Sequence, residues 1–333
     1  MIECIFTLDY EIYGNGKGTL RELVLDPTER LAEVFHEFDV PFVVFAEAVE
    51  FAKMEAAQSD PDITGVAAQM RKLRSIGHEI GLHLHPWWAN ARYEGGDWHL
   101  DWTERSISVL EHGRVETIVS DAIGYLRAAL EDRNFTPLSF RSGLWVMQPT
   151  PTIAKVLARH GVRVDSSVFK GGRVYGLGLD YRPAIANDHI WRFNNDVNVP
   201  DSNGSIWEIP IHTKLVPFWE MLSPKRLKLQ NKTRNASQGS PLPRHLRDFI
   251  RFRYPRKLDF CRMTLDEMRS SMEETLKQDK RNPEERNFVV AIGHSKDLVD
   301  SNAVRRFLAF LKERSVGVTT FSRFLCEKPA LLA

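Results

Sequence analysis

Two pairs of side chains that commonly bind metals stand two residues apart in the sequence. His83 and His85 lie in GHEIGLHLHPWW, and Asp9 and Glu11 lie in TLDYE. Residues i and i+2 of a strand face the same way, so each pair can converge on one ion. Two imidazoles and one carboxylate, with the other carboxylate free, match a hydrolytic metal site that keeps a position for water. A pair of core or surface histidines and solvated acids in a turn are the alternatives.

Two more polar residues end other apolar runs. Arg141 precedes SGLW, where its permanent charge could keep a catalytic carboxylate ionised and oriented. His294 follows FVVAIG, a position suited to a general acid or base. A surface arginine and a structural histidine are the alternatives. We favour the catalytic interpretation because four separate strand ends carry such residue types together.

The elements that must position these residues are predicted from alternating strand-like and helical segments. Strand-like segments are predicted at 2–8, 41–46, 79–84, 137–141, 162–165, 206–211, 288–292 and 316–320. Helices are expected between them, including one from near Thr103 to Leu130, one opened by a capping box at Thr264, and one capped by Asn302. This alternation indicates an α/β fold with a mainly parallel sheet or barrel, and seven or eight strands can close a barrel.

Composition sets the broad class of the protein. The 333 residues are 43% hydrophobic and 27% charged with a net charge of +1, which indicates a soluble globular protein and not a nucleic-acid binder. Three scattered cysteines without a C-x-x-C pattern argue against a disulfide framework or a thiolate zinc site. The sequence suggests no signal peptide and no membrane span, so we expect a cytoplasmic protein with a single domain over residues 1–333.

The four polar segments, in this order, resemble the motifs of the polysaccharide deacetylase family (NodB-homology, carbohydrate esterase family 4). That family has an acidic first motif, a G-H-E-[IV]-x-x-H strand, an F-R-x-x motif and a late histidine. The motifs span nearly the whole chain. The resemblance implies a distorted (β/α) barrel with seven strands and a divalent metal, often zinc. It also implies hydrolysis of an N-acyl group, acetyl or formyl, on an amino sugar.

The resemblance also implies a role for each residue. Asp9 is the expected general base, Arg141 orients it, and His294 protonates the leaving amine. Glu11, His83 and His85 are the expected metal ligands.

Two positions depart from the family pattern and indicate an atypical branch. Tyr10 stands where the family has its second acid, so Glu11 must substitute for it. Trp87 stands where the second histidine is expected, four residues after His83, and His85 is the nearest replacement. Five tryptophans in or near the motifs could stack on sugar rings, although we expect at least half to be core residues: Trp87, Trp88, Trp98, Trp102 and Trp145.

A strongly basic segment interrupts the pattern at 224–262. It holds twelve Lys/Arg and two acids, a net charge of +10, whereas the rest of the chain carries −9. We interpret it as an insertion in the domain, with a short basic amphipathic helix over 245–254. A nucleotide-linked or lipid-linked glycan precursor would suit it, as would peripheral contact with anionic lipid at the inner face of the membrane. A solvated basic loop is the alternative.

Two other functions fit the same residues. One is a different metal-dependent amidohydrolase that acts on a small non-sugar amide. The other is a catalytically silent glycan-binding protein that kept the fold. The metal content of the purified protein distinguishes the silent glycan-binding protein, which needs no metal, from the metal-dependent enzymes.

Overall fold

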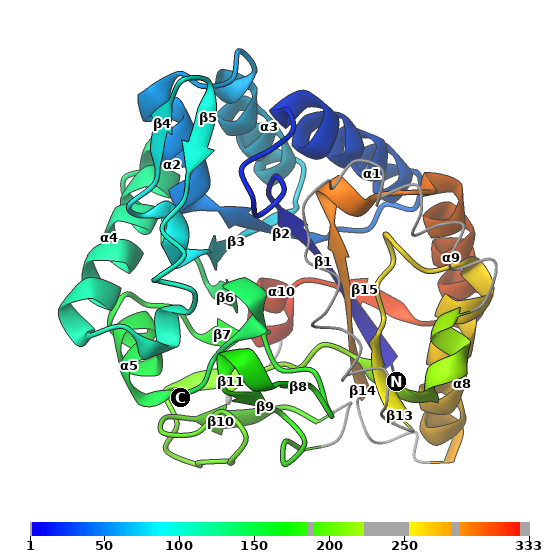
Figure 1. Cartoon of the computed structure of the whole chain (residues 1–333). Helices are drawn as coiled ribbons and strands as arrows, with labels where there is room; N and C mark the ends of the chain where they lie inside the picture. The colour runs from blue at the N-terminus through cyan, green and yellow to red at the C-terminus, as the bar shows by residue number, and fades with distance from the viewer. Residues whose placement is uncertain (1, 186–188, 223–252, 282–286, 327–333) are drawn as a thin grey trace.

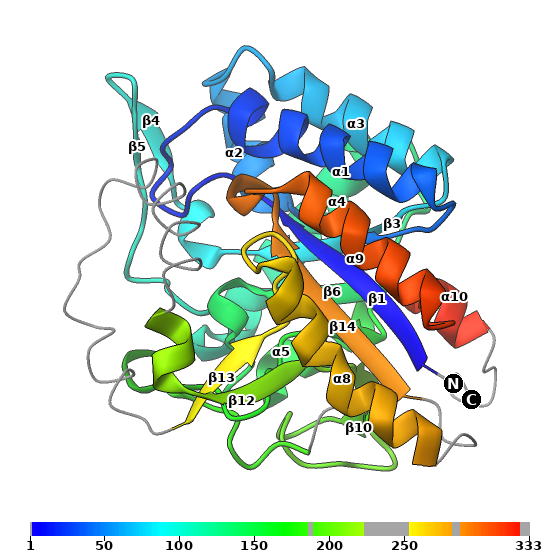
Figure 2. The ribbon, with the colours of Figure 1, turned by 90° about the vertical axis from the view of Figure 1, so that its right-hand side faces the viewer.

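The computed structural model describes residues 2–185, 189–222, 253–281 and 287–326. In these residues a curled, mostly parallel sheet lies at the centre, with helices packed around its outer face (Figures 1 and 2). The parallel strands, in their order across the sheet, are β11 (Ile206–Glu208), β7 (Val164–Asp165), β6 (Ser139–Ser142), β3 (Glu79–Leu84), β2 (Val43–Glu47), β1 (Ile2–Tyr10) and β14 (Asn287–His294). β15 (Gly317–Thr319) pairs with the start of β1, and β10 (Trp191–Phe193) adds an antiparallel edge to β11.

The two sides of this sheet approach each other. The chain after β11 forms a single parallel bridge from Ile211 to Val290 of β14, and the N–H of His212 donates to the carbonyl of Val290 at 2.9 Å. The sheet is therefore a distorted β/α barrel, in agreement with the fold predicted from the sequence.

Helices cover the outside of the barrel. They are α1 (Asp26–Glu37), α2 (Ala48–Ala57), α3 (Ile63–Ser75), α4 (His112–Ala129), α5 (Pro151–Arg159), α8 (Leu265–Arg281), α9 (Ser301–Glu313) and α10 (Phe321–Cys326). No helix of the described residues is both long and apolar enough to cross a membrane.

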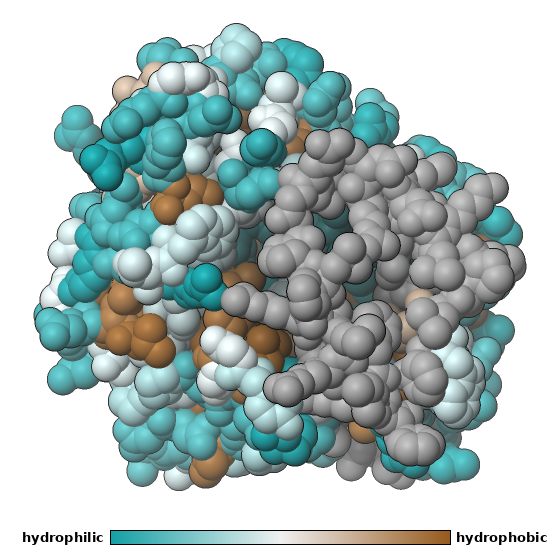
Figure 3. All heavy atoms as spheres, in the orientation of Figure 1, coloured by the Kyte–Doolittle hydropathy of each residue, from teal (hydrophilic) through white to brown (hydrophobic). Residues whose placement is uncertain are grey.

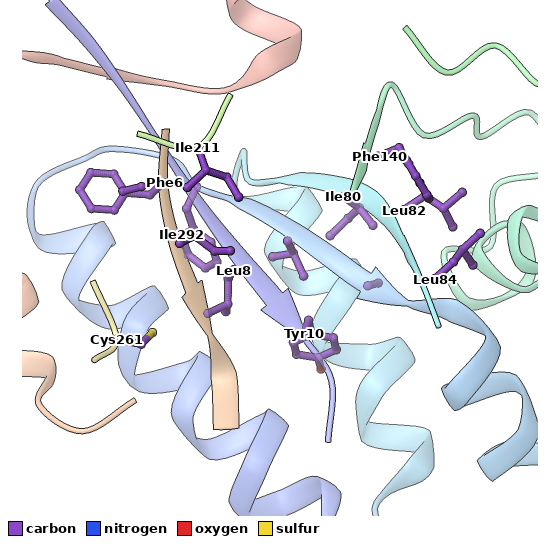
Figure 4. Close-up of a cluster of buried hydrophobic side chains, with 14 of the residues drawn as sticks. Phe6, Leu8, Tyr10, Ile80, Leu82, Leu84, Phe140, Ile211, Cys261 and Ile292 are labelled. Atoms are coloured by element: carbon purple, nitrogen blue, oxygen red, sulfur yellow. The ribbon is translucent and has the colours of Figure 1, made fainter. Parts of the chain in front are cut away.

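Successive side chains of a strand point to opposite faces of the sheet, and this separates the core residues from the site residues. Phe6, Leu8 and Tyr10 of β1 belong to the large buried cluster between the sheet and its helices, together with alternate residues of β3 (Figure 4). Thr7 and Asp9, which lie between them in the sequence, therefore face the inside of the curled sheet. Ile5 and Phe45 belong to the smaller buried cluster on that inner side.

Several predicted boundaries differ from the observed ones. The helix expected from near Thr103 starts at His112, after a short 3₁₀ turn at Ile107–Val109. Helix α9 is capped by Asp300 and not by Asn302, because the Asp300 side chain accepts from the N–H groups of Asn302 and Ala303. The capping box before α8 is present, with hydrogen bonds between Thr264 and Glu267 in both directions.

Three short antiparallel ribbons were not predicted. They are β4 (Arg92–Glu94) with β5 (Asp97–His99), β8 (Arg173–Val174) with β9 (Leu179–Asp180), and β12 (Thr213–Pro217) with β13 (Arg253–Lys257). Strands of two to five residues bury too little apolar surface to leave a clear periodic signal.

The structure describes only the end of the basic segment, and residues 224–252 lie outside the described residues. Arg253 and Tyr254, predicted at the end of a helix, are part of strand β13. The chain then runs alongside β14, where Ile292 N–H donates to the Leu258 carbonyl at 2.8 Å and Phe260 N–H donates to the Ile292 carbonyl at 2.9 Å. This end of the segment is therefore built into the barrel.

Candidate metal centre

Strand register brings the predicted site residues to one end of the sheet. Asp9 is directly opposite His294 in the β1–β14 pair, and His83 is opposite Arg141 in the β3–β6 pair. Glu11 follows β1 and His85 follows β3. Since these strands are parallel, their carboxyl ends meet at the same edge, where sites in α/β barrels form.

Glu11, His83 and His85 form a compact buried group. Oε2 of Glu11 lies 3.5 Å from Nε2 of His83 and 3.2 Å from Nδ1 of His85. Ligands bound to one tetrahedral metal at about 2.0–2.2 Å are about 3.3–3.6 Å apart, so these separations suit a shared ion. None of the three atoms has a hydrogen-bond partner of acceptable geometry among the described residues.

This lack of partners is the main evidence for a metal. Buried polar atoms normally find a partner, and three unpaired ligand atoms that face one another leave a position for a cation. The other ring nitrogen of His83, Nδ1, lies 2.8 Å from the carbonyl of Arg141, which favours the tautomer that leaves Nε2 free as a ligand. The donor set of two imidazoles and a carboxylate therefore fits a divalent metal such as zinc.

The charges around this group also suit a cation. Burial alone would raise the pKa of Glu11, but Lys296 and the two histidines outweigh it and hold that pKa well below its usual range. Burial lowers the pKa of His85 to about 3, so this ring is neutral and ready to bind a metal. Burial would also lower the pKa of His83, but Asp9 and Glu11 raise it above its usual value. A metal would take the place of that proton.

Asp9 is held by a different set of contacts. Nη1 of Arg141 donates to Oδ1 of Asp9 at 2.8 Å and also to the hydroxyl of Thr7 at 2.8 Å. Nε of Arg141 donates to the Ser166 carbonyl at 2.9 Å, so the guanidinium is fixed and fully buried. Burial would raise the pKa of Asp9, but Arg141, with the two nearby histidines, lowers it below its usual value.

His294 lies on the other side of this carboxylate. Its Nε2 is 3.4 Å from Oδ2 of Asp9 and 4.0 Å from Oε1 of Glu11. Asp9, Glu11 and His294 are thus a second group whose ligand atoms are close enough to hold a metal. We favour the first group, because Asp9 is already bonded to Arg141 and Oε1 of Glu11 to Lys296.

The structure therefore brings together all six residues named from the sequence. The two departures from the family pattern have a physical reason. Tyr10 points into the helical layer, where its hydroxyl donates to Oε1 of Gln69 at 2.8 Å, so Glu11 is the next residue on the face of Asp9. Trp87 is buried in a turn, with its ring centroid 4.3 Å from that of His85. Trp88 is buried as well, whereas Trp102 is exposed.

Sequence reasoning did not assign three residues that support the site. Nζ of Lys296 donates to Oε1 of Glu11 at 2.8 Å and to the Ile12 carbonyl at 2.9 Å. Glu47, fully buried, accepts from the backbone N–H of His85 at 2.8 Å. Glu50, also fully buried, accepts from the backbone N–H of Ile12 at 2.9 Å. The signal that could have found the two glutamates is their place in the otherwise apolar stretch from 40 to 52.

Glu47 and Glu50 hold the backbone at His85 and next to Glu11. Burial raises the pKa of Glu50 to about 8, and burial together with the neighbouring Glu50 raises that of Glu47 well above its usual value. Each carboxyl group therefore tends to keep its proton while it holds a backbone N–H beside a ligand. Their role is to position the loops that carry Glu11 and His85.

Comparison with known proteins supports the fold and leaves the sequence family open. No protein-family model and no curated protein sequence matches the chain. Among solved structures, a Mycobacterium smegmatis protein assigned as a polysaccharide deacetylase matches with a TM-score of 0.54 and 18% identity, over 99% of this chain and 90% of its own. A Pseudomonas aeruginosa PAO1 protein assigned the same activity matches with a TM-score of 0.51 and 14% identity, over 98% and 91%.

A third neighbour is named for a different activity. The PuuE allantoinase matches with a TM-score of 0.50 and 16% identity, over 97% of this chain and 88% of its own. At these identities the likeness is one of fold. These three neighbours, two of them assigned as deacetylases and one as an allantoinase, share the overall fold of this chain.

Proposed function

We propose that this protein is a metal-dependent hydrolase that removes an N-acyl group, acetyl or formyl, from an amino sugar. The observation that carries the proposal is the set of three unpaired ligand atoms on Glu11, His83 and His85 beside an ionised Asp9. A divalent metal, for which zinc is the first choice, supplies there the polarisation of the acyl carbonyl and the acidification of water.

The residues around the ligands supply the proton transfers. Asp9 accepts the proton of the attacking water, and Arg141 keeps this carboxylate ionised and oriented. His294 donates a proton to the departing nitrogen, because an amine leaves far more easily than an amide anion. Its distance of 3.4 Å from Asp9 allows both groups to reach one reacting amide.

The choice of an amino sugar rests on the neighbours assigned as polysaccharide deacetylases. We further propose a nucleotide-linked or lipid-linked glycan precursor, because the segment 224–262 carries a net charge of +10 and both precursors carry a diphosphate. Peripheral contact of this segment with anionic lipid belongs to the same proposal.

A second candidate is hydrolysis of a small non-sugar amide. The allantoinase neighbour favours it, since that enzyme shares the fold at a similar TM-score. A panel of N-acetyl and N-formyl amino sugars, their nucleotide-linked and lipid-linked forms, and cyclic amides would distinguish the two candidates by the product released. Bound metal without turnover on any of them would favour a silent glycan-binding protein.

Asp9→Asn is the sharpest test of the mechanism. We expect the variant to keep its metal and to lose turnover by about 10²–10⁴-fold, which is the usual contribution of a general base. Metal content and turnover should be measured on the same preparation. Asp39→Asn, at an exposed helix end, is the matched control and should behave like the wild type. Near-normal turnover of Asp9→Asn would exclude Asp9 as the base, and loss of the metal would make Asp9 a ligand.

A further inference from the structure

Lys257 is a lysine at the rim of the metal centre without a carboxylate partner in the described residues. Its Nζ lies over the ring of Trp145, 3.0 Å from the centroid, and 4.4 Å from the centroid of Phe169. No described residue accepts a hydrogen bond from this ammonium or pairs with it as a carboxylate within 4 Å. An ammonium has three N–H donors, and a partly buried one left without acceptors is costly.

The other cations around the centre are paired. Arg141 binds Asp9, Lys296 binds Glu11, and Arg262 lies 3.6 Å from Asp297. Lys257 therefore differs from its neighbours in having aromatic faces where they have carboxylates. Two aromatic rings hold the amine in place and leave its remaining donors for a molecule that is not part of the protein.

The fold places Lys257 beside the reacting groups. Lys257 is the last residue of strand β13. Two residues later, Asp259 forms a parallel bridge with Ile292 of β14, which lies two positions before His294. The Trp145 ring that contacts Lys257 also meets the His294 ring edge to face, with centroids 5.8 Å apart. Trp145 takes this position with a φ of 59°, and its neighbour Leu144 has a φ of 55°. Two consecutive non-glycine residues in this region are strained, which is typical of functional sites.

Trp145 contributes a second unsatisfied donor. Its Nε1 is buried and has no hydrogen-bond partner among the described residues. The indole N–H can only donate, so it suits an acceptor such as a carboxylate or phosphate oxygen. An ammonium and an indole N–H on neighbouring side chains are the donor types expected of an anion site.

We propose that Lys257, with Trp145, forms a subsite that binds an anionic group of the substrate, a carboxylate or a phosphate, next to the acyl group that is cleaved. This inference rests on the proposed hydrolase function and narrows its substrate to anionic amino-sugar derivatives. The negative group of the substrate supplies the partner that Lys257 lacks.

The electrostatic surroundings of Lys257 support this role. Burial lowers the pKa of Lys257 to about 7, with further lowering by Arg262 and Arg141 that Asp259 and Asp9 oppose. A bound anion would raise that pKa and keep the amine charged. Anion binding should therefore weaken as the pH rises through about 7.

The test compares Lys257→Met and Lys257→Arg with the wild type on three substrates. N-acetylglucosamine 1-phosphate carries a phosphate, N-acetylmuramic acid carries a carboxylate, and N-acetylglucosamine is uncharged. We expect Lys257→Met to raise KM about 10- to 100-fold on the charged substrate that the enzyme prefers, with little change of kcat. Its kinetics on the uncharged sugar should not change, and Lys257→Arg should restore part of the affinity. The preferred charged substrate distinguishes phosphate from carboxylate.

Lys312→Met, an exposed basic residue of helix α9 outside the segment 224–262, is the control for a general loss of positive charge. A rise of KM in Lys312→Met equal to that in Lys257→Met would overturn the subsite. An equal fall of kcat on charged and uncharged substrates in Lys257→Met would overturn it as well, since Lys257 would then act in the chemistry.

Calorimetric titration with sulfate separates the subsite from the proposed function, because it needs no turnover. We expect binding to the wild type that weakens above pH 7, binding to Lys257→Arg that persists at higher pH, and none to Lys257→Met. If the binding pattern holds and no N-acyl sugar is hydrolysed, the hydrolase proposal fails and the anion subsite stands. If sugars are hydrolysed and anion binding ignores Lys257, the subsite is wrong.

Discussion

Gly143 lies against the ring of His85, and the gap between them leaves no room for a side chain. A Cβ at this position would come within 2.4 Å of Cδ2 of His85 and 2.5 Å of the Leu84 carbonyl. The carbonyl belongs to strand β3 and cannot move without disturbing the sheet. The glycine of the RSGLW motif is therefore needed for close packing against His85, a proposed metal ligand.

We expect Gly143→Ala to weaken metal affinity about 10- to 100-fold, the usual effect of displacing a group that orients a ligand. Competition with a metal-binding dye would measure this. Gly124→Ala is a matched control, because a Cβ at Gly124 of helix α4 meets nothing within 4 Å. Equal metal affinities in the two variants would show that the contact with His85 does not matter.

At the same scale, the sequence predicted which residues form the candidate site better than it predicted which other residues contact them. The i, i+2 spacing and the strand ends were enough to group His83 with His85, and Asp9 with Glu11. Partners such as Lys296 for Glu11, or Glu47 for the His85 backbone, depend on how separate strands and loops meet. No local pattern contains that information. Whether the six named residues have the roles expected of them stays a prediction.

At the scale of elements, His78 connects the starts of two strands. Its Nδ1 accepts from the backbone N–H of Phe42, just before β2, at 3.1 Å, and its ring packs on the Phe42 ring with centroids 4.0 Å apart. Burial, with a contribution from Arg323, lowers the pKa of His78 to about 4. The folded protein therefore holds this ring neutral under conditions in which the unfolded chain protonates it.

This difference makes stability depend on pH. Between about pH 6.5 and 4 the unfolded state binds a proton that the folded state does not, so the free energy of unfolding should fall by about 3 kcal/mol as the pH drops through this window. We expect His78→Asn, whose amide oxygen can accept from Phe42, to be less stable at neutral pH but to lose less on acidification. Urea unfolding of both proteins at several pH values measures the two slopes. Parallel slopes would mean that His78 does not cause the effect.

The elements themselves were predicted with uneven success, and the pattern has a physical reason. The strand at 79–84 was predicted with its observed bounds, because its apolar residues Ile80, Leu82 and Leu84 alternate along the chain and together face the helical layer. The cap of α9 was misplaced by two residues because Asp300 and Asn302 both suit an N-cap and only the backbone decides between them. The short ribbons left no signal at all.

At the scale of the whole molecule, the metal should stabilise the folded state. An ion that binds only the folded protein adds about 4 kcal/mol at a concentration of 1,000 times its Kd. We expect zinc to raise the thermal midpoint by several degrees and a chelator to reverse this. His83→Asn should lose the response, because an asparagine amide can still donate to the Arg141 carbonyl but offers no ligand in place of Nε2. A midpoint that responds equally in both proteins would place the metal elsewhere.

The two halves of the candidate site are closed by loops of very different length, because β1 pairs with β14 from the far end of the chain. The proposed ligands Glu11, His83 and His85 come from one early stretch of the chain, whereas Asp9 meets His294 across a loop about four times longer. Closing the longer loop costs about 1.2 kcal/mol more in chain entropy, since each doubling of length costs about 0.6 kcal/mol. We therefore expect a refolding chain to regain metal binding before it regains hydrolysis. Stopped-flow measurements of dye competition and of product release would record the two phases, and simultaneous recovery would show that the barrel forms in one step.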